Sequence, residues 1–158
     1  MDKLINLLTI FSKYYPNLEN IKVEIEIERY NNLYIARCLV NKTGDYIYVK
    51  KGRILNIMPK KIIMTDVAME KKENEMLFIF IHECSHAITH HRERKVKSKF
   101  LRIDHSREFY ENFLKLLNIA YNNKLINLKF NNIEELMKKD KRKENENNDL
   151  KLYAFLNQ

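Results

Sequence analysis

The sequence predicts an α+β fold in which a small antiparallel sheet of three to four strands packs on two consecutive helices. The first half of the chain holds short segments in which apolar and polar residues alternate, with turn residues between them. Consecutive strands joined by short turns favour an antiparallel sheet. The second half holds two stretches whose apolar residues fit helices, one that should begin between residues 68 and 75 and one from His105.

The N-terminal segment predicts an amphipathic helix and not a signal peptide. Its apolar residues recur at helical spacing until Pro16 ends the run: Leu4, Leu7, Leu8, Phe11 and Tyr15. Asp2 and Asn6 interrupt the apolar stretch, and no small-residue cleavage site follows it. No apolar run reaches the roughly 18 residues of a membrane span, so we expect no membrane partner.

Alternating patterns and turn residues define the expected strands, which are residues 21–29, 33–40, 46–49 and 54–58. We expect turns at 31–32 and at 41–45, the second of which contains Gly44, and a hairpin at 50–52. Pro59 should end the last strand. Residues 60–67 fit either a further strand or a connecting segment.

The composition fits one globular domain, because 45% of the 158 residues are apolar and 32% are charged. The two cysteines, Cys38 and Cys84, provide neither a disulfide framework nor a cysteine-based zinc ribbon. This favours a reducing, intracellular compartment, the cytoplasm or the nucleus. The formal net charge of +8 favours acidic partners, with nucleic acid first among them, although excess lysine also serves solubility.

The clearest chemical pattern is His82-Glu83-Cys84-Ser85-His86, on a helix that should begin between residues 68 and 75 and end near His90. It fits H-E-x-x-H, in which the two histidines lie one helical turn apart on the same face. They can present two imidazoles to one zinc ion, while Glu83, about 100° round the helix, lies beside the ion. Cys84 lies about 200° from His82 and should point into the core. The alternative is an ordinary helix with hydrogen-bonded core histidines.

A third ligand has to come from another segment. His90 stands two turns, about 12 Å, from His82, so a straight helix cannot bring both to one ion. His90 and His91 are left only as doubtful fourth ligands. His105 is the best candidate, since it heads a stripe that should pack inward: His105, Phe109, Phe113, Leu116, Leu117 and Ala120. Asp104 is a plausible helix cap, and Asp104 and Glu108 are alternative carboxylate ligands. A capping or surface histidine is the alternative for His105.

A basic segment, residues 92–102, lies between the second and third candidate ligands. Its basic residues outnumber the single acid, Glu93, and are Arg92, Arg94, Lys95, Lys97, Lys99 and Arg102. Because it connects two ligands, we expect it near the mouth of the site, in contact with a phosphate backbone or an acidic substrate. A solvated loop is the alternative.

The C-terminal residues complete the expected organisation, with a single domain over 1–136. Residues 125–130 fit a short strand or an extended segment, and 133–137 fit a short helix. Residues 137–149 are rich in charge and predict a linker. Residues 150–158 include apolar residues again and should dock back on the domain, with binding of a partner or a second subunit as the alternative.

The motif HECSH, followed by HSREF at the start of a helix, resembles the zinc metallopeptidases of the WLM and SprT (Spartan-like) families. In those families a third histidine, in the form H-x-x-x-F, opens the helix after the motif. The positions that match are His82, Glu83, His86, His105 and Phe109. The resemblance covers residues 77–130 and implies a minimal zincin-like domain.

The resemblance also implies an activity, the proteolysis of DNA-crosslinked or chromatin proteins. The chain departs from the SprT pattern at Ser106, where those proteins often have glycine, and residues 109–158 contain no cysteines that could form a zinc ribbon. Proteins of the WLM type also occur in large DNA viruses.

Together these patterns predict a zinc-dependent endopeptidase. His82, His86 and His105 would hold the zinc ion, and Glu83 would act as general base on a zinc-activated water. A protein or peptide would be the substrate, with DNA as a further partner. The rival prediction is a non-catalytic, zinc-stabilised DNA-binding protein that uses the basic segment. A hydrolase that acts on bonds other than peptides is a third.

Overall fold

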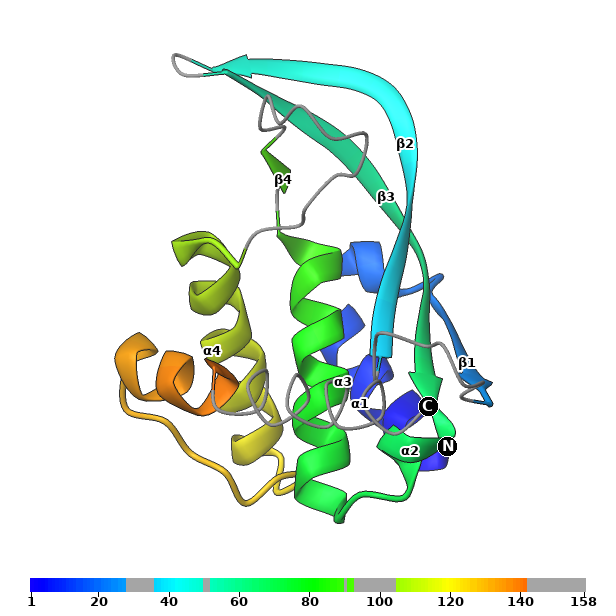
Figure 1. Ribbon diagram of the computed structural model, residues 1–158, viewed down its shortest axis with the longest axis vertical. Helices are drawn as coiled ribbons and strands as arrows, with labels where there is room; N and C mark the ends of the chain where they lie inside the picture. Colours follow the sequence, from blue (N-terminus) through cyan, green and yellow to red (C-terminus); the bar gives the residue numbers. More distant parts are fainter. Residues whose placement is uncertain (28–35, 50–51, 90, 93–104, 142–158) are drawn as a thin grey trace, which may run out of the picture.

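The computed structural model describes residues 1–27, 36–49, 52–89, 91–92 and 105–141 (Figure 1). Within these ranges only the backbone is described for residues 37, 39–60 and 91–92. In this part of the chain, helix α3 stands between the sheet and helix α4, so it contacts most of the other elements.

Among the described residues the sheet has four strands, which are β1 (Lys22–Glu26), β2 (Ala36–Val49), β3 (Gly52–Thr65) and β4 (His91–Arg92). Strand β3 pairs with all of the others, because the order is β1-β3-β2 and β4 also pairs with β3. Strands β2 and β4 run antiparallel to β3, whereas β1 runs parallel to it. The predicted α+β class is therefore confirmed.

The prediction of a purely antiparallel sheet is wrong. We expected β1 to pair with the strand that follows it, yet β3 lies between β1 and β2, with Val23 opposite Ile62. Strand β2 runs opposite to β1, and the chain reverses again from β2 to β3. Strand β3 therefore runs in the same direction as β1. This arrangement depends on contacts between distant residues, which alternation along one strand does not reveal.

Strands β2 and β3 are longer than predicted. The turn expected at 41–45 lies inside β2, where the pairing register shifts between Lys42 and Tyr46. Pro59 does not end β3, because it pairs with Val40 at a second register shift. A proline has no backbone N–H to give to the ladder, and an irregular point in the pairing accommodates it. The predicted hairpin is confirmed by the pairing of Val49 with Gly52, and residues 50–51 lie outside the described part.

The helices follow the predicted apolar stripes. They are α1 (Asp2–Ser12), the short α2 (Asp66–Met69), α3 (Glu73–Ile88) and α4 (Arg107–Asn122), with a 3-10 turn at Pro16–Leu18. The apolar face of α1 is buried, as is that of α4: Leu4, Leu7, Leu8 and Phe11, then Phe109, Phe113, Leu116, Leu117 and Ala120. None of the described helices is long and apolar enough to cross a membrane.

A further helix, residues 133–141, is longer than the short helix predicted at 133–137. We expected a helix only to Met137 and a charged linker from there to 149, but the helix continues through 141. Leu136 is fully buried and Asp140 is 4% exposed, so this face of the helix packs on the domain. Residues 142–149 and 150–158, including the segment expected to dock, lie outside the described residues.

Helix α1 offers a matched test of the core. Leu7 is 1% exposed and Ile5 is 45% exposed on the same helix. We expect Leu7→Ala to lower the free energy of unfolding by about 2–5 kcal/mol, because it removes buried apolar volume. Ile5→Ala should cost less than about 1 kcal/mol. Urea denaturation measures both values, and equal losses would contradict the packing of α1.

Candidate metal centre

His82 and His86 face one another across one turn of α3. Their Nε2 atoms are 3.1 Å apart, as expected for residues i and i+4 on one helical face. His86 is 8% exposed, and the side chain of His82 is 15% exposed. The local spacing in the sequence thus brings two imidazoles together near the middle of the molecule.

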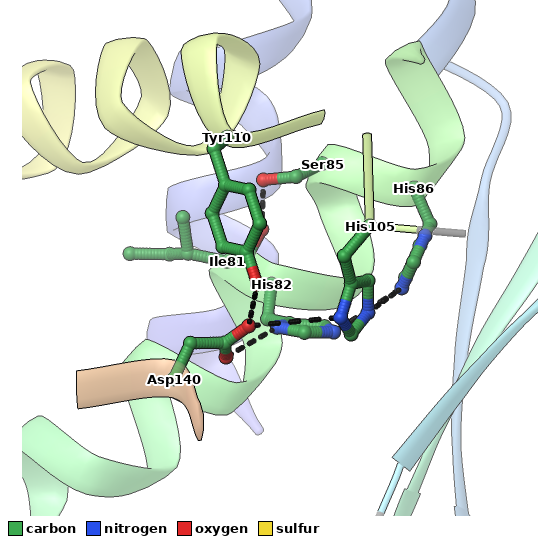
Figure 2. A network of polar contacts seen from close by, with 7 residues as sticks. All are labelled: Ile81, His82, Ser85, His86, His105, Tyr110 and Asp140. Carbon is green, nitrogen blue, oxygen red and sulfur yellow. Dashed lines mark hydrogen bonds and ion pairs between the residues drawn. The ribbon is translucent and has the colours of Figure 1, made fainter. Parts of the chain in front are cut away.

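His105 joins this pair from the residue that precedes the cap of α4. Its Nε2 lies 3.2 Å from Nε2 of His86 (Figure 2). The helix cap is Ser106 and not Asp104, because the Ser106 hydroxyl oxygen accepts a hydrogen bond from the backbone N–H of Phe109 at 3.2 Å. The cap fixes where α4 begins, and so fixes the position of His105 just before it.

The predicted set of three histidines is therefore brought together. Within the described residues His82, His86 and His105 form a group that can hold a metal ion, with ligand atoms within 4.8 Å of one another. Glu108 is not part of that group. The other candidates, Asp104, His90 and the side chain of His91, lie outside what the structure describes.

The contacts among the three rings fit a cation better than hydrogen bonds. An imidazole nitrogen carries in its ring plane either one hydrogen or one lone pair, so Nε2 of His86 cannot make good hydrogen bonds to two neighbours at once. A cation between the rings accepts a lone pair from each. Two nitrogens bound tetrahedrally at about 2.1 Å from one ion lie about 3.4 Å apart. The observed 3.1 and 3.2 Å differ from that by a few tenths of an ångström.

An aromatic layer supports the three rings. The ring of Phe109, which is fully buried, lies 4.4 Å from that of His86, 4.6 Å from that of His105 and 4.9 Å from that of His82, measured between centroids. Phe113 adds a contact of 5.4 Å with His82. These aromatic side chains restrict rotation of the imidazoles and exclude water from one side of the site.

Asp140 and Tyr110 lie beside His82, on the side that faces away from His86 (Figure 2). Asp140 Oδ1 is 3.0 Å from Nδ1 of His82, and Oδ2 accepts a hydrogen bond of 3.0 Å from the Tyr110 hydroxyl group. Oδ2 also lies 3.8 Å from Nδ1 of His105. Burial raises the pKa of Asp140, but the hydrogen bond and charge of His82, helped by His105 and Tyr110, outweigh it and hold that pKa below its usual value.

Sequence reasoning missed Asp140, because it sits in a run of charges that predicted a linker. A signal was nevertheless present: Ile133, Leu136, Met137 and Asp140 are spaced as one helical face. An acidic residue that continues an apolar stripe has to be buried with a partner or to end the helix.

Glu83 lies between α3 and the sheet. It is 7% exposed, and its carboxylate accepts a hydrogen bond from the backbone N–H of Cys38 in β2. Burial raises the pKa of Glu83, and the charge of His82 and the Cys38 N–H act in the opposite direction. The predicted general base thus sits next to one of the histidines, on the side of α3 that faces β2.

The remaining predicted site residues are less informative. Cys84 is fully buried, as expected from its position on α3. Of the basic segment 92–102, only the backbone of Arg92, in β4, is described, so no nucleic-acid contact of this segment is placed.

A comparison with protein-family models, with curated proteins and with solved structures finds no match for this chain. The resemblance to WLM and SprT metallopeptidases therefore stays a prediction from the motifs alone.

The Ser106 cap can be tested directly. Ser106→Ala removes the acceptor for the Phe109 N–H, and we expect a loss of about 1 kcal/mol in the free energy of unfolding. Ser106→Asp keeps an acceptor and should restore most of that stability. Urea denaturation of the two variants gives the comparison, and indistinguishable variants would mean that the cap contributes nothing.

The two cysteines should be unreactive in the folded protein. Burial raises the pKa of Cys38 to about 12 and that of Cys84 well above its usual value. A thiol reagent needs an accessible thiolate. At pH 8 we expect no modification by an aromatic disulfide reagent over minutes, and modification of both thiols after urea unfolding. Rapid reaction of a folded thiol would contradict the burial.

Proposed function

We propose that this protein is a zinc-dependent endopeptidase. The observation that supports the proposal is the convergence of three Nε2 atoms, from His82, His86 and His105. Glu83, the residue after His82, is buried and its charge interacts with that of His82. Three neutral nitrogen ligands and an adjacent carboxylate are the groups that zinc hydrolases use.

The site fits a catalytic zinc better than a structural one. Structural zinc sites have four protein ligands, whereas catalytic sites have three and an open position. Asp140, a described carboxylate in contact with His82, engages the Nδ1 side of that ring and accepts a hydrogen bond from the Tyr110 hydroxyl group. It therefore lies on the opposite side of that ring from the nitrogen that would bind the ion.

Each group of the site would have a different role in peptide hydrolysis. Zinc at this site would polarise the substrate carbonyl and lower the pKa of a water molecule towards about 7. Glu83 accepts the proton of the attacking water and gives it to the leaving amine. The three histidines direct their Nε2 lone pairs towards the position of the ion. The Phe109 ring packs against His86 and His105 and keeps water from that side of the site.

The sheet offers a way to hold the substrate. Strand β2 is at one end of the strand order, and its Cys38 N–H reaches the Glu83 carboxylate. An extended peptide that adds to such an edge gains backbone hydrogen bonds and lies beside the general base. If the substrate is a protein bound to DNA, the basic residues of segment 92–102 could contact the DNA phosphates. The evidence for this contact is the sequence of the segment.

Substitution of Glu83 tests the mechanism. Glu83→Gln keeps the size of the side chain but removes the base, so we expect it to bind zinc normally and to lose peptidase activity by at least about 100-fold. Glu75→Gln, on the same helix but two turns away, is the matched control and should keep full activity. Hydrolysis of an unfolded protein substrate provides the assay, and an active Glu83→Gln enzyme would end the proposal.

Substitution of single histidines tests the ligand set. The chain has five histidines, and replacement of His82, His86 or His105 by alanine should abolish stoichiometric zinc binding, whereas His91→Ala should keep it. Elemental analysis after dialysis measures the bound metal. A His105→Ala variant with full zinc content would show that another residue supplies the third ligand.

The rival function, DNA binding without catalysis, predicts a different result. DNA affinity that survives removal of zinc with a chelator, in a protein that cleaves no substrate with or without DNA, would favour the rival. Cleavage that a chelator stops and added zinc restores would favour the peptidase.

A further inference from the structure

We infer that Asp140 is a positioning residue of the metal centre: with Tyr110 it fixes which nitrogen of His82 faces the ion. The inference rests on the metal centre of the proposed function and not on its peptidase activity. It assigns a role to helix 133–141, which supplies the carboxylate.

The contact between Asp140 and His82 determines which nitrogen of His82 carries the hydrogen. Nδ1 of His82 is 3.0 Å from Asp140 Oδ1, and a carboxylate can only accept, so Nδ1 has to carry the hydrogen. A neutral imidazole has a hydrogen on one nitrogen alone. Nε2 of His82 is therefore left with its lone pair, and Nε2 is the atom that faces His86.

The second step concerns the other oxygen of Asp140. Oδ2 accepts the hydrogen bond from the Tyr110 hydroxyl group at 3.0 Å, which prevents the carboxylate from turning away from His82. The same oxygen lies 3.8 Å from Nδ1 of His105, too far for a hydrogen bond but close enough for attraction to an N–H at that position. Asp140 thus favours the metal-ready form of two rings.

Burial of the Asp140 carboxylate costs free energy because it removes the group from water, which indicates that the carboxylate has a role at the site. Asp140 is 4% exposed and Tyr110 is 3% exposed, so the carboxylate has lost nearly all contact with water. A leucine at this point of the stripe would pack helix 133–141 at no such cost. Carboxylates that orient ligand histidines in this way strengthen metal binding by about 10–100-fold.

The arrangement also links three helices. His82 belongs to α3, Tyr110 to α4 and Asp140 to the helix 133–141, as Figure 2 shows. Metal binding should therefore stabilise the docking of helix 133–141, because the site is complete only when that helix is in place.

The test compares zinc affinities by competition with a chromophoric chelator. We expect Asp140→Asn to bind zinc about 10–100-fold more weakly than the wild type, and Tyr110→Phe to lose less, because it removes only the support of the carboxylate. Glu134→Gln removes an exposed carboxylate from the same helix and should bind zinc as the wild type does. This control separates the role of Asp140 from a general effect of charge.

A spectroscopic measurement separates positioning from simple stabilisation of the fold. Long-range 1H–15N correlation of the zinc-loaded wild type should show His82 with its hydrogen on Nδ1 and zinc on Nε2, and this assignment needs no variant that folds poorly. Leu136→Ala, which loosens the same helix without touching the carboxylate, should lower stability while the folded protein keeps this nitrogen pattern.

Two results would overturn the inference. One is wild-type zinc affinity in Asp140→Asn, and the other is a His82 that binds zinc through Nδ1. Either result leaves a zinc-binding peptidase intact, so it would not count against the proposed function. A wild-type protein that binds no zinc would overturn both proposals.

Discussion

The packing of α3 against α4 is the constraint on which the site depends. Two of the three imidazoles come from α3, and the third immediately precedes α4, so their convergence requires that the helices meet in one register. Phe113 of α4 helps to set that register, because its ring packs on two residues of α3, Phe78 at 5.0 Å and His82 at 5.4 Å. The Asn112 amide also donates to the Thr89 hydroxyl oxygen just beyond α3. A slip of one turn, about 5.4 Å, would remove His105 from the group.

The site places several polar groups in the interior, and each buried carboxylate in the described part of the chain has a partner. Glu83 accepts from the Cys38 N–H, and Asp140 interacts with His82 and Tyr110. An ionised carboxylate buried alone would cost several kcal/mol, a large part of the stability of a domain of this size. The apolar contacts of α1, α3 and α4 have to offset what remains of that cost, which is why the histidines are surrounded by phenylalanines.

The parts of the site that follow from local geometry could be predicted from the sequence, and the parts that depend on distant contacts could not. The i, i+4 spacing places His82 and His86 on the same face of α3. The apolar stripe that follows His105 along α4 indicates that His105 also faces inward. The parallel pairing of β1 with β3 depends instead on where a hairpin docks. Pro59 was misread because a proline inside a strand needs a register shift, which only the partner strand reveals.

Asp140 shows how a functional position can be hidden by composition. In a run such as KKDKRKENENND, charge suggests a solvated segment, and a single acid carries no signal of its own. Helical spacing from Leu136 places it on the buried face, 58 residues from the histidine that it contacts. The domain consequently extends at least to residue 141. A boundary drawn at 136 would remove the carboxylate, and it would leave Nδ1 of His82 without the acceptor that, in the metal centre we propose, determines which of its nitrogens is the ligand.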